Sequence, residues 1–128
     1  MVAVASREQP VRAVVIDDTT DIRELLRLAL SRGGMDVVGE AGDGRAGVEL
    51  VRVERPDVVL LDLAMPVMDG VEALPLIREL VPDARIIVFS AFAGAVTRQV
   101  LECGADGYVV KGTPLREVVA YVDGTLVR

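Results

Sequence analysis

Five short apolar runs are spaced almost regularly along the chain and alternate with segments of helical periodicity. The runs begin near positions 11, 35, 57, 85 and 107 and are rich in valine and isoleucine. The first, third and fourth are continuous apolar segments, which is typical of strands buried on both faces of a sheet. The pattern therefore predicts five strands, with the sequences VRAVVID, MDVVGEA, DVVLLDL, RIIVFSA and GYVVK.

After each run, apolar positions recur at the spacing of an amphipathic helix. The first helical stripe ends at Gly33-Gly34, a pair that commonly stops a helix. The last helix is predicted to start with Thr113 as its N-cap and Pro114 at its first position. Three more helices are predicted near 44–54, 71–81 and 94–103.

The regular alternation of strands and helices implies an α/β fold with a parallel sheet, right-handed crossovers and helices on both faces. We expect the flavodoxin-like form, a doubly wound five-stranded parallel sheet in the order 2-1-3-4-5 with five helices, which makes a three-layer α/β/α sandwich. Ligands of such sheets bind outside the carboxyl ends of the strands, where the strand order reverses. The residues that follow each strand are therefore candidates for a functional role.

Composition narrows the class of protein. The 128 residues fit one domain, which we assign to 11–128 with residues 1–10 as a flexible leader. Hydrophobic residues make up 52%, but no apolar stretch reaches the roughly 18 residues of a membrane-spanning helix. The net charge of −6 disfavours direct binding to nucleic acid. With no histidine and a single cysteine, the chain has no histidine-based catalysis and no internal disulfide, and we expect a cytoplasmic protein without membrane contact.

Polar side chains follow four of the five predicted strands. Asp17 and Asp18 follow the first, Asp62 the third, Ser90 the fourth and Lys111 the fifth. In the expected strand order these side chains converge at one edge of the sheet. Three carboxylates there would repel one another unless a divalent cation lay among them, and an all-oxygen ligand set suits Mg²⁺ or Mn²⁺. Ordinary turn residues at strand ends are the simpler alternative.

Lys111 is the only lysine in the chain. A compact ammonium on a flexible stem suits an anionic oxygen in a small site, whereas a solvated surface lysine is the alternative. Carboxylates that hold a metal, a spare carboxylate, a lysine and a hydroxyl are the parts needed for phosphoryl transfer to an aspartate. Asp62 is the best candidate for the nucleophile because it stands alone after a central strand, whereas Asp17 and Asp18 are adjacent and better placed to hold the ion.

Four motifs then resemble the receiver domain of the response regulators of bacterial two-component signalling. They are VVIDD at 14–18, LLDLAMPVMDG at 60–70, VFSA at 88–91 and ECGADGYVVK at 102–111. The resemblance implies a phosphorylatable switch that is not an enzyme, apart from self-catalysed phosphorylation and dephosphorylation of its own aspartate. The phosphoryl donor that it implies is a sensor histidine kinase.

The same resemblance implies the residues of the phosphorylation site. Asp62 matches the phosphoacceptor and Lys111 the lysine that contacts the phosphoryl group. The Mg²⁺ ligands that it implies are Asp17, Asp18, Asp62 and the backbone carbonyl of Ala64, with Asp18 as a direct ligand.

Two switch residues are implied as well. Ser90 matches the hydroxyl that turns toward the phosphoryl group, and Tyr108 matches the aromatic residue on the fifth strand. Both would move inward on phosphorylation. The surface formed by the fourth helix, fifth strand and fifth helix would then change and control an output domain or a partner protein.

The segment around Lys111 departs from the most common family pattern. Gly112 stands where a proline is frequent, which leaves both isomers of the Lys111–Gly112 peptide bond open. The missing proline and the GADGY segment resemble receivers that are joined to a helix-turn-helix output domain. Residue 128 falls at the end of the last predicted helix, so both a stand-alone receiver and a fragment of a longer regulator fit the sequence.

Three other functions fit part of the pattern. A haloacid-dehalogenase-like phosphatase also forms an aspartyl phosphate, but it needs D-x-D after its first strand, and Asp17-Asp18-Thr19 does not supply it. A flavodoxin-like FMN binder would here have a phosphate site lined by acids. A degenerate receiver that serves only protein interaction is disfavoured by the complete acidic set and Lys111.

Two further features are interpreted as structural. The segment 42–47 matches G-x-G-x-x-G but follows the outer second strand, so we expect turn glycines and Asp43 as a helix N-cap rather than a nucleotide site. Cys103 lies at helical spacing from Val96 and Val100, which predicts a small, buried core residue.

Overall fold

A computed structural model describes residues 9–91 and 95–126. The predicted leader, residues 1–10, therefore lies mostly outside the described residues. Strands and helices alternate along the described chain, at the places that the apolar pattern predicts. They are β1 (Arg12–Ile16), α1 (Thr20–Arg32), β2 (Asp36–Ala41), α2 (Gly44–Glu54), β3 (Val58–Leu61), α3 (Gly70–Leu80), β4 (Arg85–Ser90), α4 (Ala95–Glu102), β5 (Gly107–Val110) and α5 (Leu115–Leu126).

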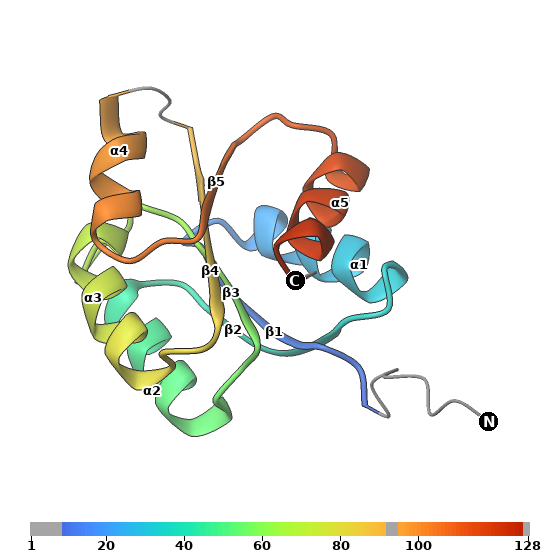
Figure 1. The fold of residues 1–128 in the computed structure, drawn as a ribbon, viewed down its shortest axis with the longest axis horizontal. Helices are drawn as coiled ribbons and strands as arrows, with labels where there is room; N and C mark the ends of the chain where they lie inside the picture. The colour runs from blue at the N-terminus through green and yellow to red at the C-terminus, as the bar shows by residue number, and fades with distance from the viewer. Residues whose placement is uncertain (1–8, 92–94, 127–128) are drawn as a thin grey trace.

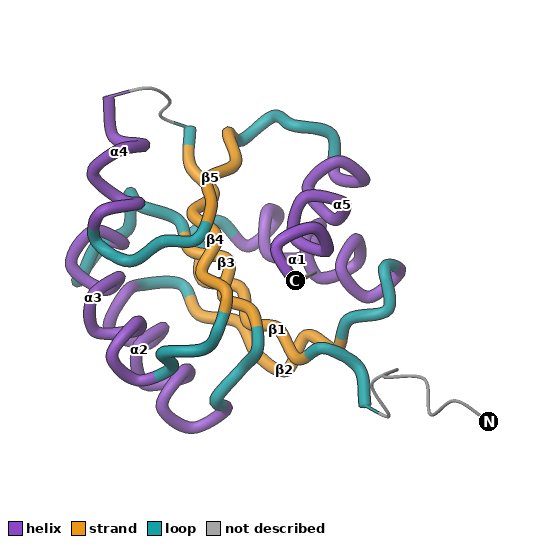
Figure 2. Tube along the Cα trace, viewed as in Figure 1, coloured by secondary structure: helices purple, strands orange, loops and turns teal. Residues whose placement is uncertain are grey.

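The five strands form one parallel sheet in the order β2-β1-β3-β4-β5, as predicted. Helices α2, α3 and α4 cover one face of the sheet, and α1 and α5 cover the other (Figure 1). Coloured by secondary structure, the strands form a middle layer between the two helical layers (Figure 2). The chain reverses its direction of winding between β1 and β3, so the carboxyl ends of these two neighbouring strands flank the switch point.

The core is divided into two clusters by the alternation of side chains along each strand. Val14 and Ile16 belong to the cluster with buried residues of α2, α3 and α4, whereas Ala13 and Val15 belong to the cluster with buried residues of α1 and α5. All four residues of β3 are buried, because helices cover both sides of this central strand. This explains why the run appears as a continuous apolar segment rather than an alternating one.

The predicted helix starts are confirmed at two places. Asp43 is the N-cap of α2, and its carboxylate accepts a hydrogen bond from the backbone N–H of Ala46 at 2.8 Å. Asp69 caps α3 in a capping box with Glu72, and the helix begins at Gly70, one residue before the predicted start near 71.

The predicted N-cap of the last helix is wrong. The Thr113 hydroxyl donates to the carbonyl of Val110 at 2.7 Å instead of accepting from the helix. The carbonyl of Pro114 accepts from the N–H of Val118, so Pro114 precedes the first residue of α5, Leu115. The threonine is held by the turn after β5, a tertiary context that a local capping pattern does not contain.

The prediction of a buried Cys103 is also wrong, since this residue is exposed. Val100 is buried in the core cluster, but Cys103 follows the last residue of α4, Glu102. Gly104 has a φ of +114°, so the chain turns here and the helical spacing no longer applies.

The glycine-rich segment after β2 has a packing role. Gly44 begins α2, and a Cβ on this residue would lie 2.1 Å from the backbone oxygen of Met68. The loop follows β2, the edge strand, and not one of the strands at the switch point. Both findings support the structural interpretation of the motif.

No cis peptide bond occurs in the described residues, so the Lys111–Gly112 bond is trans. In the same part of the chain, no helix has the length and apolar character needed to cross a bilayer.

Candidate functional site: a carboxylate cluster with one lysine

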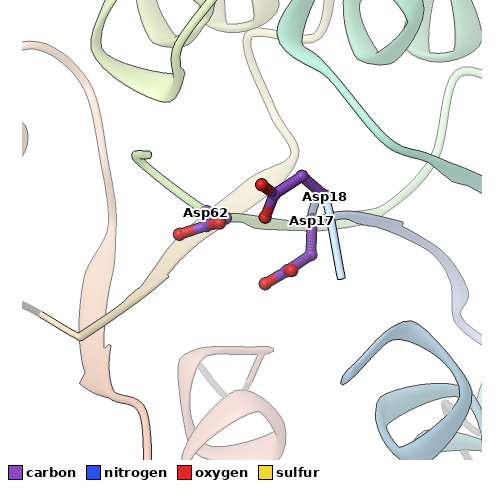
Figure 3. Close-up of side chains that lie close together, drawn as sticks. All are labelled: Asp17, Asp18 and Asp62. Atoms are coloured by element: carbon purple, nitrogen blue, oxygen red, sulfur yellow. The ribbon is translucent and has the colours of Figure 1, made fainter. Parts of the chain in front are cut away.

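The strand ends bring the predicted acidic residues together. Asp17 follows β1 and Asp62 follows β3, and the last residues of these two strands, Ile16 and Leu61, are paired in the sheet. The backbone N–H of Asp62 donates to the carbonyl of Ile16 at 2.9 Å, which holds the two strand ends in register. Figure 3 shows the side chains of Asp17, Asp18 and Asp62 gathered at this edge.

The three carboxylates are close enough to share one cation. Their ligand oxygens lie within 4.8 Å of one another. Asp17 is 1% exposed and Asp62 is 3% exposed, whereas Asp18 is exposed to solvent. The cluster thus has two buried acids at its base and one at its open side.

Lys111 is the cation that faces this cluster. Its Nζ lies 2.8 Å from Oδ2 of Asp17 and 3.3 Å from Oδ2 of Asp62. Its backbone N–H donates to the carbonyl of Ser90, and its ammonium lies 5.9 Å from the centre of the Phe89 ring. The ends of β4 and β5 therefore direct this lysine toward the ends of β1 and β3.

The negative charge of the cluster is only partly compensated. Within residues 9–91 and 95–126, three carboxylates and one ammonium make up this cluster. Oδ2 of Asp17 and Oδ2 of Asp62 are buried and accept no well-directed hydrogen bond within the described chain, although both lie at ion-pair distance from Nζ. A hard divalent cation would satisfy such oxygens, and the all-oxygen donor set fits Mg²⁺ or Mn²⁺. The site is therefore capable of binding a metal ion.

The pKa values of two groups are displaced from their usual range. Burial, followed by the charge of Asp17, raises the pKa of Asp62, and the opposing effect of Lys111 is smaller. Burial alone would lower the pKa of Lys111, but its contacts with Asp17 and Asp62 outweigh burial and raise it. The ammonium of Lys111 is therefore held in its charged form, whereas the charged form of Asp62 is disfavoured by burial and by the neighbouring negative charge.

The remaining predicted residues lie around the same edge. Ser90 is the last residue of β4 and is buried. Tyr108 on β5 packs against the core cluster on the side of α4, and its hydroxyl is buried without a hydrogen-bond partner in the described chain. Ala64 lies in the loop after Asp62 and is exposed. The functional roles of these residues remain predictions.

Two features beside the cluster were not predicted from the sequence. A cavity of about 450 Å³ adjoins Asp18, and it is lined largely by apolar side chains of the loop after β3, of α3 and of α4. The guanidinium of Arg23 lies against the backbone of Asp17. The position of Arg23 at the start of α1, shortly after the acidic pair, is the signal that could have indicated it.

Comparisons with known proteins define the family. A family model described as the response regulator receiver domain matches residues 13–123. The chain belongs to this family. Its cluster of Asp17, Asp18 and Asp62 is typical of receiver domains that are phosphorylated.

This receiver domain is similar both to a transcriptional regulator and to a chemotaxis protein. It is 41% identical over 121 residues to the transcriptional regulatory protein NarL of Mycobacterium tuberculosis, covering 91% of this chain and 56% of NarL. It is 36% identical over 101 residues to the chemotaxis protein CheY of Thermotoga maritima, covering 78% of this chain and 84% of CheY. The chain thus spans most of CheY but little more than half of NarL. The likeness to NarL agrees with the predicted resemblance to receivers of transcriptional regulators.

A solved structure supports the same assignment. The CheX–CheY complex of Borrelia burgdorferi with BeF₃ and Mg²⁺ contains a chain that superposes with a TM-score of 0.90 at 28% identity, covering 94% of this receiver domain and 92% of that chain. This receiver domain therefore has the CheY-like flavodoxin fold that the strand order predicts.

Proposed function

We propose that this receiver domain is a switch in which Asp62 accepts a phosphoryl group from a sensor histidine kinase in a Mg²⁺-dependent reaction. One observation carries the proposal. Asp62 is buried at the base of the cluster, and its Oδ2 lies 3.3 Å from Nζ of Lys111 without a well-directed hydrogen bond. A carboxylate in this environment combines a reactive oxygen with a nearby cation.

The transfer would form one bond and break another. An electron pair of the Asp62 carboxylate forms the bond to phosphorus, while the bond between phosphorus and the donor imidazole nitrogen breaks and that nitrogen keeps the electron pair. The ammonium of Lys111 and the hydroxyl of Ser90 would contact the oxygens of the phosphoryl group.

Mg²⁺ completes the proposed site. Its protein ligands would be Asp17, Asp18, Asp62 and the carbonyl of Ala64, and Mn²⁺ would serve as a substitute. When bound, the ion would neutralise the negative charge that gathers on the transferred group.

The signal would leave the site through the α4-β5-α5 surface. Phosphorylation adds negative charge at the carboxyl edge of the sheet. Ser90 lies at that edge, and Tyr108 packs against the same core cluster as Val96 of α4. We propose that phosphorylation favours the inward positions of these two switch residues and that the surface then controls an output domain or a downstream protein.

Three properties belong to the same proposal. The domain would catalyse only its own phosphorylation and dephosphorylation. It would not bind nucleic acid directly, since its net charge is −6. A cytoplasmic location is favoured by the single cysteine, which has no partner for an internal disulfide.

Intact mass after incubation with acetyl phosphate tests the proposal. The wild type should gain one phosphoryl group with Mg²⁺ and none with chelator, and Asp62→Asn should gain none in either case. No gain by the wild type under conditions that label a known receiver would favour the degenerate, interaction-only receiver. Equal labelling of Asp62→Asn would place the phosphoryl group on another residue.

Removing one crowded charge should stabilise the metal-free domain. We expect Asp62→Asn to raise the free energy of unfolding by about 1–2 kcal/mol at pH 7, because Lys111 keeps its partner Asp17. The folded-state pKa of Asp62 is raised above its ordinary value of 3.8, so the wild type loses stability as pH rises through that raised pKa. The gain of the variant should therefore shrink toward zero near pH 4, which urea denaturation in chelator at several pH values would measure.

The control for this variant is Asp123→Asn, which makes the same charge change at an exposed position on α5. It should leave stability within about 0.5 kcal/mol of the wild type. Added Mg²⁺ should stabilise the wild type more than Asp62→Asn. A lower melting temperature for metal-free Asp62→Asn would contradict the account of a crowded acidic cluster.

A further inference from the structure

Arg23 holds the backbone of the acidic pair in place. Its Nη1 donates to the carbonyl oxygen of Asp17 at 2.6 Å. Its Nε donates to Glu40 at 3.2 Å, and its Nη2 donates to the hydroxyl of Thr20 at 3.3 Å. The guanidinium therefore ties the end of β1 to β2 and to the first turn of α1.

The carbonyl of Asp17 belongs to the peptide that leads to Asp18. The neighbouring groups of Asp17 are fixed independently: its N–H donates to Ala41, and its Oδ1 accepts from the N–H of Thr19. Asp18 is exposed, and within the described residues its carboxylate accepts a single, long hydrogen bond of 3.5 Å from the Thr19 hydroxyl. The direction of the Asp18 side chain thus depends on the orientation of this peptide, which Arg23 holds at its oxygen end.

The guanidinium is itself well fixed. The Arg23 side chain is 18% exposed, and Glu40, which accepts from it, also accepts from Arg27 at 2.8 Å. Glu40 lies on β2 opposite Val15 of β1, so the carboxylate is placed by the sheet rather than by a loop. Charge-assisted hydrogen bonds from a preorganised fork of donors hold a backbone oxygen firmly.

We propose that Arg23 is a positioning residue that orients Asp18 for Mg²⁺ binding. This inference rests on the proposed function, because it assumes that the carboxylate cluster holds Mg²⁺. Residues that orient metal ligands without touching the metal commonly change metal affinity about 10–100-fold when they are replaced. Arg23 therefore acts on the acidic pair through the backbone and not through its charge.

A positioning role of Arg23 and a purely electrostatic role predict opposite changes in Mg²⁺ affinity when Arg23 is replaced, and this makes the inference testable. Loss of a positive charge near the cluster would by itself strengthen the binding of a cation. Loss of the hydrogen bond to Asp17 would weaken the binding of Mg²⁺, because Asp18 would no longer be held toward the other carboxylates. Arg27 offers the matched control, since it lies on the same helix, pairs with the same Glu40 and is 56% exposed. In the described part of the chain it makes no hydrogen bond or ion pair with Asp17.

The experiment measures the Mg²⁺ dissociation constant of the whole chain by calorimetric titration. Arg23→Met should raise this constant about tenfold or more, whereas Arg27→Met should leave it unchanged or lower it slightly. The Mg²⁺-induced rise in melting temperature should fall in parallel for Arg23→Met alone. At saturating Mg²⁺, the rate of labelling by acetyl phosphate should stay within about threefold of the wild type, since Arg23 touches no reacting group.

A conservative variant guards against a folding defect. Arg23→Lys keeps the charge, but one ammonium cannot reproduce the three directed bonds, so it should raise the constant by about threefold or more. If both Arg23 variants bind Mg²⁺ as tightly as the wild type, the positioning role is overturned while the proposed function stands. If the wild type binds no Mg²⁺, the proposed function and this inference both fail.

Discussion

Lys111→Met should slow phosphorylation by acetyl phosphate at least about 100-fold. The ammonium lies at ion-pair distance from Asp17 and Asp62, and it is the only lysine available to the site. Its loss removes a side-chain cation that, among the described residues, has no substitute at the position where negative charge gathers during transfer. The rate of mass gain at saturating Mg²⁺ would measure the effect.

The same variant should also be less stable without metal. Two buried carboxylates would lose their shared cation, and an uncompensated buried charge costs about 3 kcal/mol. The changes in the free energy of unfolding caused by Lys111→Met and Asp62→Asn should therefore have opposite signs. Lys111→Met removes the positive charge that faces the cluster, whereas Asp62→Asn removes one of its three negative charges. The double variant should recover part of the stability that Lys111→Met loses.

Lys111→Arg is the matched control, because it keeps the charge and changes the shape. A planar guanidinium should retain most of the stability, since it still faces both carboxylates. Phosphorylation should remain slow, because the fork does not fit a site shaped for a compact ammonium. A labelling rate of Lys111→Met within about threefold of the wild type would contradict the proposed contact with the phosphoryl group.

Most of the fold could be predicted because the apolar pattern is a direct consequence of burial. The run at β3 is continuous because both faces of a central strand are covered, and the positions of all five strands follow from such runs. The strand order then places the residues after β1, β3, β4 and β5 at one edge. The strand order alone therefore predicts that Asp17, Asp62 and Lys111 lie close together.

What could not be predicted depends on contacts between segments that are distant in the sequence or on a local change of direction. Threonine is a common N-cap residue, but the hydroxyl of Thr113 donates to the carbonyl of Val110 in the turn after β5. Cys103 continues a helical spacing that ends one residue earlier. Arg23 lies on the polar side of an amphipathic helix, and only the packing of α1 beside β2 brings its guanidinium to Glu40 and Asp17. A single-sequence pattern contains no information on such pairings.

Gly70→Ala should destabilise the domain by about 3 kcal/mol and lower the melting temperature by about 10 °C. Gly70 is the first residue of α3, and a Cβ there would lie 2.1 Å from the backbone oxygen of Asp62 and 2.8 Å from Cα of Leu63. Because both contacts are with backbone, no side-chain rotation relieves them, and α3 must move away from the end of β3. Thermal and urea denaturation followed by circular dichroism would measure the loss.

The control for this substitution is Gly124→Ala, in the interior of α5, where a Cβ meets nothing within 4 Å. This variant should gain about 0.5–1 kcal/mol, because alanine favours the helix over glycine. Opposite signs for the same chemical change would show that close approach, and not the loss of a glycine, determines the effect at Gly70. The crowded oxygen belongs to Asp62, the proposed phosphoacceptor, so folded Gly70→Ala should also be labelled by acetyl phosphate more slowly than Gly124→Ala. A Gly70→Ala variant as stable as the wild type would mean that the start of α3 does not pack against the backbone that carries Asp62.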